Sequence, residues 1–295
     1  MKLPGAAVSL TRIRESIADG LRARVVGPNA AQRTAEIMDA PGERWFTEDR
    51  PIRLVHADAS MFIGGLRSLL LQSLHPLAIA GVAGHSDYRK DPWGRLQRTA
   101  DFLAATSFGP ADEARRIVDR VKAVHTKVNG IASDGRRYSA TDPHLLKWVH
   151  VAEIDSFLYA YQKFGKAPLD QEGRDGYVKD AAYIASALGV VNPPTTEMEL
   201  RTMLNAYRPE LKSTRESRDA ARYLLFKPPL QGASKVIYWL LVIATVSTLP
   251  VWARVPLRVA YLPVVEPVLL RPLGHALTIG LRWVTSTPII ETDAQ

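Results

Sequence analysis

The spacing of apolar residues constrains this chain more than any other feature of its sequence. Along most of its 295 residues, apolar side chains recur every three to four positions, and strict strand-like alternation is almost absent. The run 144–164 is apolar on most sides and follows Asp142-Pro143, a typical helix start, so it predicts a central helix. Another helix is predicted to end at His75-Pro76, because proline disfavours α geometry in the residue before it. These patterns predict an all-α protein, a globular bundle of many helices.

Familiar nucleotide-binding and hydrolase motifs are absent from the sequence. It contains no G-x-G-x-x-G loop, no P-loop, no G-x-S-x-G elbow and no H-E-x-x-H pair. Gly64 and Gly65 stand together inside a helical pattern, where the lack of a side chain lets two backbones approach closely. We therefore expect this pair to serve helix packing.

The sequence has no cysteine, which limits its chemistry. Disulfides, zinc–thiolate sites, iron–sulfur clusters and thiolate-ligated haem are excluded, so any metal must be held by His, Asp, Glu or a cofactor ring. The net charge is +8, but the basic residues are spread along the chain and no nucleic-acid-binding motif is present. We expect no nucleic-acid partner. An anionic cofactor, a membrane surface and simple solubility all remain open as reasons for the positive charge.

Two segments bear on localisation. Residues 1–10 lack the features of a signal peptide, which favours a cytoplasmic protein. Residues 236–253 form the one long uncharged run, at the lower length limit for a membrane span. Its threonine, serine and proline residues favour a buried or interfacial helix over a true span. Because Arg254 and Arg258 follow directly, peripheral membrane contact is a further expectation.

Histidines carry much of the remaining candidate chemistry. His125 falls on the apolar stripe of a helix that is predicted to begin at Gly109-Pro110 and to run to Asn129-Gly130. An imidazole that faces inward must be hydrogen-bonded or bind a metal, and this pattern leaves both possibilities open. His75 ends a helix, where it can either cap that helix or bind a ligand.

Two further pairs share a helix face. His150 and Glu153 stand three residues apart, which is one half of a di-iron bundle site. No second pair of this kind is found on a comparable helix, so a di-iron centre is not expected. Arg95 and Thr99 stand four residues apart on another helix, and taken alone they predict only a solvated face.

A series of short motifs, taken in order, resembles a known family. The motifs are Gly42-Glu43-Arg44-Trp45, Leu71-Gln72-Ser73-Leu74-His75-Pro76, Gly81-Val82, His85-Ser86, Asp91-Pro92, Arg95-Leu96-Gln97-Arg98-Thr99, Phe108-Gly109-Pro110, Val124-His125-Thr126-Lys127-Val128-Asn129-Gly130, Tyr138, Asp142-Pro143 and Trp148-Val149-His150. This order resembles the MpaB-type and rubber-oxygenase catalytic domain, which includes the latex clearing proteins. We therefore expect an N-terminal helical extension (1–41), a catalytic domain (42–211) and a C-terminal helical subregion packed on the core (212–295).

The resemblance implies a globin-like all-α core that holds a b-type haem. By position in the motifs, His125 is implied as the iron ligand, with Arg95 and Thr99 near the haem as catalytic residues. The implied substrates are dioxygen and a small apolar molecule, isoprenoid or lipid. The implied reaction is oxidative cleavage or oxygenation of a C=C bond.

Three further residues complete the expected cofactor-binding set. Lys122 matches a basic position three residues before the family's ligand histidine. Arg98 is placed to pair with a haem propionate, because propionates are anionic. His75 joins the set without an assigned role.

The sequence departs from the family pattern at two points. Arg98 stands where some rubber oxygenases carry a lysine that can cap the iron, and a guanidinium is a poor iron ligand because it does not normally deprotonate. Those enzymes also use a glutamate as a proposed base, yet no glutamate occurs between Glu48 and Glu113. Two alternatives stay open: a haem- or ligand-binding helical protein without turnover, and a membrane-associated helical scaffold.

Overall fold

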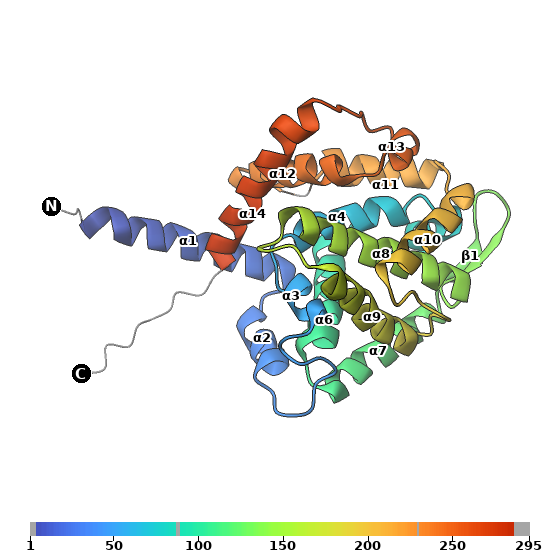
Figure 1. Cartoon of the computed structure of the whole chain (residues 1–295), viewed down its shortest axis with the longest axis horizontal. Coiled ribbons are helices and arrows are strands. Elements are labelled where there is room, and N and C mark those ends of the chain that lie inside the picture. Colours follow the sequence, from blue (N-terminus) through green and yellow to red (C-terminus); the bar gives the residue numbers. More distant parts are fainter. Residues whose placement is uncertain (1–3, 87–88, 229, 286–295) are drawn as a thin grey trace.

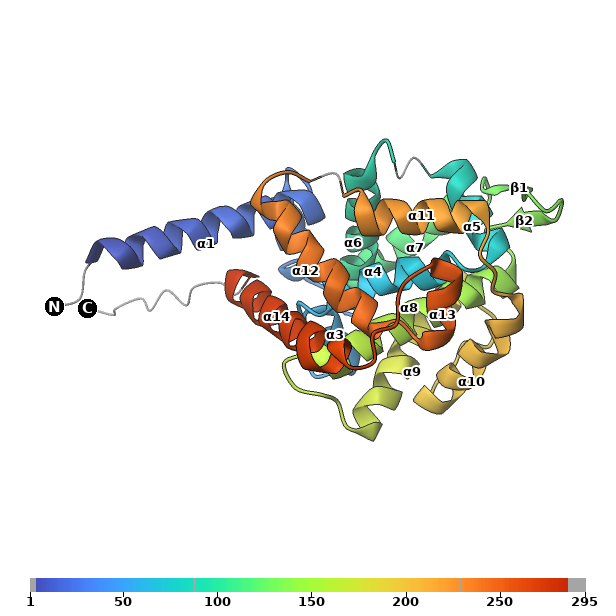
Figure 2. The same cartoon turned by 90° about the horizontal axis from the view of Figure 1, so that it is seen from above.

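The computed structural model describes residues 4–86, 89–228 and 230–285. Within these ranges the chain forms fourteen α-helices and a two-stranded antiparallel sheet, so the predicted all-α class is confirmed. Figure 1 shows the helices gathered around a central one, with α1 projecting to one side. Figure 2 shows the same projection from above.

The elements follow one another along the chain. The first part forms α1 (Pro4–Val25), α2 (Ala30–Met38), α3 (Pro51–His56), α4 (Met61–Gln72) and α5 (Pro76–His85). The middle forms α6 (Pro92–Phe108), α7 (Ala111–His125), β1 (Asn129–Ile131), β2 (Arg137–Ser139) and α8 (Pro143–Phe164). The last part forms α9 (Gln171–Leu188), α10 (Glu197–Tyr207), the short 3₁₀ helix η1 (Arg208–Glu210), α11 (Arg215–Phe226), α12 (Ala233–Thr248), α13 (Val251–Leu257), the π-helix η2 (Glu266–Leu270) and α14 (Arg271–Thr285).

Proline and aspartate set the helix starts, as the sequence predicted. Asp142 caps α8 by accepting a hydrogen bond from the His144 amide at 2.8 Å, and Pro143 occupies the first helical position. α4 ends at Gln72 and α5 begins at Pro76, and the two helices bend by 106° at this break. The bend follows from the restriction that proline places on the residue before it.

α7 is shorter than the sequence predicted. It ends at His125, whereas a helix to Asn129-Gly130 was expected. Gly130 lies in β1 instead, paired with Tyr138 of β2. A Cβ at Gly130 would lie 2.7 Å from the Tyr138 hydroxyl oxygen, so any larger residue would have to displace the Tyr138 ring.

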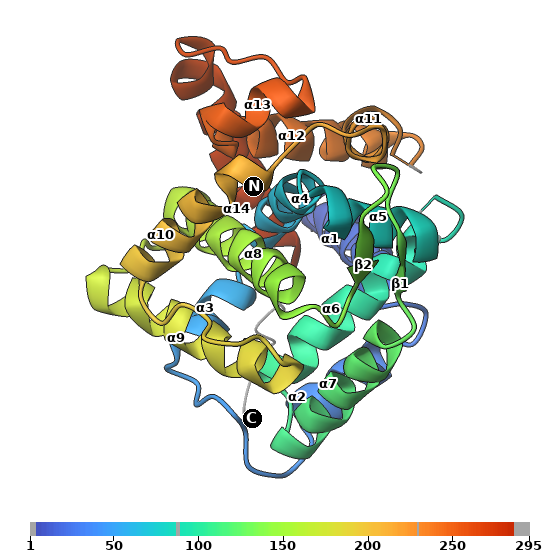
Figure 3. The same ribbon diagram turned by 90° about the vertical axis from the view of Figure 1, so that its right-hand side faces the viewer.

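α8 runs through the middle of the molecule, which confirms its predicted central position (Figure 1). α4 packs against α8 more extensively than any other pair of described elements, and α3, α9 and α10 also contact α8. Figure 3 shows α8 among α4, α9 and α10. Buried side chains from Phe46 to Leu257 join in one apolar cluster around these helices. The division into three parts at residues 41 and 211 stays a prediction.

The closest approach of α4 and α8 is at Gly64. A Cβ there would lie 2.7 Å from Cδ1 of Phe157 and 3.1 Å from the backbone oxygen of Ser156. A Cβ at Gly65 would lie 3.8 Å from the Phe157 ring, which is ordinary contact. The predicted packing role is therefore confirmed for Gly64, whereas Gly65 has room for a methyl group.

Arg67, one turn beyond Gly64, joins three helices. Its guanidinium is buried and donates hydrogen bonds to Asp155 Oδ2 at 2.7 Å and to Ser156 Oγ at 2.8 Å, both on α8. It also donates to the backbone oxygen of Thr248 at the end of α12, at 3.2 Å. A buried charge is stable only with such partners, so Arg67 orients α4, α8 and α12 relative to one another.

The uncharged run 236–253 does not form one helix. α12 ends at Thr248 and α13 begins at Val251, because Pro250 interrupts the run. α12 buries one face against α4 and α14, as expected of a core helix. Among the described helices, none is both long enough and apolar enough to cross a membrane alone. α4 and α5 together meet those criteria, but they are sharply bent with respect to each other.

We expect Gly64→Ala to lower the free energy of unfolding by about 1–3 kcal/mol, because the added methyl group must displace Phe157 or the α8 backbone. The matched control is Gly65→Ala, which should be neutral or stabilising by up to about 1 kcal/mol through helix propensity. Urea denaturation of both variants measures the difference. Equal stability of the two variants would contradict a close crossing at Gly64.

Candidate functional site

Three helices bring hydrogen-bonded polar side chains to the interior beside α8. His56 of α3 lies with its Nδ1 2.7 Å from Oγ of Ser107 on α6, and with its Nε2 3.3 Å from the hydroxyl of Tyr177 on α9. The edge of its ring packs against Phe157. Burial lowers the pKa of His56 to about 3, so the ring is neutral at physiological pH. The neutral imidazole thus bridges two hydroxyl groups.

α8 adds two titratable groups, His150 and Glu153. Burial lowers the pKa of His150 to about 4 and raises the pKa of Glu153 to about 7. His150 Nε2 is buried and makes no hydrogen bond within the described part of the chain. Burial raises the pKa of Tyr177 as well, and the negative charge of Glu153 adds to this effect. Glu153 and Tyr177 are therefore close enough to interact electrostatically.

His56 and Glu153 lie deep in the protein without being fully buried, because each keeps a small part of its surface accessible to solvent.

The arrangement is suited to proton transfer. A carboxyl group that titrates near pH 7 can both accept and release a proton at physiological pH, which an ordinary glutamate cannot do well. Titratable groups with strongly perturbed pKa values concentrate at functional sites. Glu153, with His150, His56 and Tyr177 around the same part of α8, is the clearest candidate of this kind in the described ranges.

His125, the sequence-predicted iron ligand, is the last residue of α7 and is half-buried. Burial lowers its pKa, which favours the neutral imidazole. The neighbouring Val124 is 54% exposed, so the end of α7 does not present the uniformly inward apolar stripe that the sequence predicted. α6 and α7 pack side by side and are joined at Gly109-Pro110. The end of α7 therefore lies toward the start of α6 (Figure 3).

The other predicted residues on α6 and α7 are mostly at the surface. The exposed Thr99 hydroxyl donates to the backbone oxygen of Arg95 at 3.1 Å, within its own helix. Arg98 is exposed and forms an ion pair with Asp91 at 3.5 Å. Lys122 is exposed and Arg95 is partly buried. Their catalytic and cofactor-binding roles stay predictions.

His75 lies between α4 and α5 and contacts two residues that the sequence did not connect with it. They are His144, in the first turn of α8, and Glu210, at the end of η1. Burial lowers the pKa of His75, and the Glu210 carboxylate opposes that effect. His75 is thus grouped with another histidine and a carboxylate.

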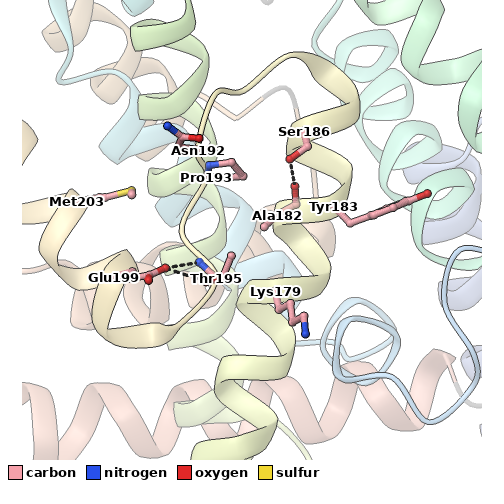
Figure 4. Close-up of a pocket in the computed structure, with 9 residues that line it drawn as sticks. All are labelled: Lys179, Ala182, Tyr183, Ser186, Asn192, Pro193, Thr195, Glu199 and Met203. Atoms are coloured by element: carbon pink, nitrogen blue, oxygen red, sulfur yellow. Dashed lines mark hydrogen bonds between the residues drawn. The ribbon is translucent and has the colours of Figure 1, made fainter.

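A separate surface pocket lies between α9 and α10 (Figure 4). Its volume is about 580 Å³, and it is lined by Lys179, Ala182, Tyr183, Ser186, Asn192, Pro193, Thr195, Glu199 and Met203. Glu199 accepts hydrogen bonds from the amide and hydroxyl of Thr195, so one of its carboxylate oxygens already has two donors from the protein. The pocket contains none of the sequence-predicted site residues.

The sequence pattern named Glu153 without its perturbed pKa, and it gave no sign of Glu210. The three-residue spacing of His150 and Glu153 placed them on one face, but it did not reveal that burial would bring the pKa of Glu153 near neutrality. Glu210 lies 66 residues from His144, and no spacing rule connects positions that far apart.

Comparison with known proteins identifies the family. The model of the family described as ER-bound oxygenase mpaB/B'/Rubber oxygenase, catalytic domain, matches residues 53–279. This range begins 11 residues after the start of the expected catalytic segment (42–211) and ends 68 residues after its end. It includes both His125 and Glu153. The chain matches no curated protein and no solved structure. Because the match covers well over half of the sequence, the chain belongs to the mpaB/B' and rubber oxygenase catalytic-domain family, and its function is of the oxygenase type.

Proposed function

We propose that the protein is a haem-b-dependent oxygenase that acts on an apolar, isoprenoid or lipid substrate. The leading reaction is oxidative cleavage of a C=C bond by dioxygen. The observation that carries this proposal is the family match over residues 53–279. That range contains a half-buried histidine whose pKa is lowered, His125, and a carboxyl group with a near-neutral pKa, Glu153.

The donor groups of this chain fit a haem. Haem iron commonly takes one nitrogen of a neutral histidine, and His125 offers a half-buried imidazole. Arg98 and Lys122 expose cationic groups on the α6–α7 pair, as the anionic propionates require. The absence of cysteine leaves histidine as the natural protein ligand.

When bound, the haem supplies the activation of dioxygen, and the chain's own residues handle protons and exclude water. Glu153 is ionised above about pH 7 and can accept a proton from the substrate. Tyr177 stays protonated, and its hydroxyl is held beside His56 Nε2. The Phe157 ring packs against His56 and gives this polar group an apolar neighbour. Apolar side chains that exclude water favour a hydrocarbon substrate and protect reactive oxygen species.

We further propose that the protein contacts membranes peripherally, from the cytoplasmic side. Residues 251–269 expose apolar side chains to solvent, with Val255 83% exposed and Val264 72% exposed. An apolar patch of this kind is typical of membrane or protein contact.

The charges of the same segment favour an anionic lipid surface. Its one acidic residue, Glu266, is buried and paired with Arg254, with Nη2 3.0 Å from Oε2. Arg258 is exposed, so the accessible charge of the segment is positive. A membrane contact would let the enzyme take up an apolar substrate without passing it through water.

His125→Ala is expected to abolish haem retention and to leave the far-UV circular dichroism spectrum unchanged, since His125 is at the end of a helix and only half-buried. The matched control is His85→Ala, at the exposed end of α5, which should retain haem. The Soret absorbance per protein measures both. A full Soret band in the His125→Ala protein would refute the ligand assignment.

Glu153→Gln is expected to lower kcat/KM by roughly 10²- to 10⁴-fold, the usual contribution of a general base. In the wild-type enzyme, kcat/KM should fall below about pH 7, where Glu153 becomes protonated. The variant's residual activity should lack this acidic limb. An unchanged pH profile of oxygen uptake in the variant would rule out the proton-accepting role.

Glu153→Gln also tests the raised pKa of Glu153 through the pH dependence of protein stability, without measuring catalysis. A rise of the Glu153 pKa from 4.5 to about 7 means that the folded protein binds this proton more tightly than the unfolded chain. The associated stability is present below pH 4.5 and is lost as pH rises to about 7, by about 3 kcal/mol in total. Glu153→Gln should therefore match the wild type in thermal stability near pH 4 and exceed it at pH 8.

Replacing Val255 and Val264 together by aspartate is expected to abolish flotation of the protein with anionic liposomes at low salt. Ile131→Asp with Met198→Asp introduces the same charge at exposed apolar positions elsewhere, and this control should float like the wild type. Failure of the wild-type protein itself to float would end the membrane proposal.

A further inference from the structure

Three side chains that can bind a metal ion converge where the α4–α5 corner, the start of α8 and the end of η1 meet. They are His75 between α4 and α5, His144 in the first turn of α8, and Glu210 at the end of η1. His144 Nε2 lies 2.9 Å and 3.0 Å from the two carboxylate oxygens of Glu210. His75 Nε2 lies 3.4 Å from Glu210 Oε2. One ligand atom from each residue lies within 4.8 Å of the others.

His75 is a buried histidine whose ring nitrogens lack hydrogen-bond partners among the described residues. His75 is almost completely buried, at 1% exposure, and neither ring nitrogen makes a hydrogen bond of normal geometry with any described residue. A buried polar group in this position costs free energy unless something binds it. Its ring lies beside the rings of Trp148 and His144, with both centroid distances 6.2 Å. A cation that bound Nε2 would satisfy one of the two nitrogens and remove that part of the cost.

The spacing of the three groups suits a divalent transition ion. Bonds of about 2.0–2.1 Å in a tetrahedral site separate neighbouring ligand atoms by roughly 3.4 Å. The distances of 2.9–3.4 Å from Glu210 to the two histidines are close to this value, so small side-chain movements would complete the geometry. His144 and Glu210 keep 53% and 41% of their side-chain surfaces exposed, which leaves an ion access from solvent and room for a water ligand.

The surrounding residues hold the ligands in position. The Tyr207 hydroxyl donates to the backbone oxygen of His144 at 2.9 Å, and its ring packs against the imidazole. The Lys212 amide donates to the backbone oxygen of Leu74 at 2.8 Å, which brings the segment after Glu210 beside His75. Contacts of this kind orient metal ligands and contribute to affinity.

We propose that His75, His144 and Glu210 bind one divalent metal ion of the Zn²⁺ type. Two imidazoles and one carboxylate with a water in the fourth position form a common zinc donor set. The ion connects the α4–α5 corner, the start of α8 and the end of η1, and it therefore stabilises the fold. The proposal does not need the haem, because none of the three residues is the proposed iron ligand, and it assigns His75 to this ion instead of to the expected haem-binding set.

The test uses the full-length untagged protein after treatment with a chelator. Calorimetric titration with zinc chloride should show one ion bound per chain and a raised melting temperature in its presence. His144→Ala and Glu210→Gln should each weaken zinc binding by more than about 100-fold, since even an outer partner of a ligand is worth roughly 10- to 100-fold. Both positions are half-exposed, so these variants should fold, as circular dichroism would verify.

His85→Ala provides the matched control, because it removes an exposed histidine outside the group, and it should bind zinc like the wild type. The haem content of His144→Ala should equal that of the wild type, which keeps this test distinct from the haem proposal. Either of two results overturns the site: the wild-type protein takes up no stoichiometric zinc, or His144→Ala and Glu210→Gln bind it as tightly as the wild type.

Discussion

The close crossing of α4 and α8 is the constraint on which the rest of the structure depends. Gly64 allows the α4 backbone to lie against Phe157, and Arg67 secures the crossing through Asp155 and Ser156. A buried guanidinium cannot be left without these partners, so the helices can slide past one another only at a large cost in free energy. The bond from Arg67 to Thr248 extends the same constraint to α12 and through it to the C-terminal helices.

Both candidate sites take their positions from this crossing. α8 carries His150 and Glu153 in its interior turns and His144 at its start, and α4 leads directly to His75. The interior part of α8 is dry enough to move the pKa of Glu153 to about 7, whereas its first turn reaches the surface and leaves His144 exposed. A single helix thus carries the proposed proton-transfer group at depth and one of the proposed metal ligands near solvent.

Local sequence patterns predicted the features that depend on neighbouring residues. The apolar spacing identified α8, Asp142 and Pro143 marked its start, and Gly64 marked a close contact. Patterns were weaker where distant partners decide the outcome. α7 stops at His125, and Gly130 pairs with Tyr138 across a hairpin that periodicity does not register. The grouping of His75 with Glu210 and the near-neutral pKa of Glu153 both arise from tertiary packing, so no spacing rule could reveal them.

We propose that this family member performs oxygen chemistry with a haem. The most direct measurement is mass spectrometry of the products formed from a polyprenyl substrate under ¹⁸O₂, with haem-loaded and haem-free protein compared. We expect ¹⁸O-labelled cleavage or oxygenation products from the haem-loaded protein and none from the haem-free protein. Equal labelling without haem would contradict haem-dependent oxygenase activity, and so would haem-loaded protein that transfers no ¹⁸O to any prenyl or lipid substrate.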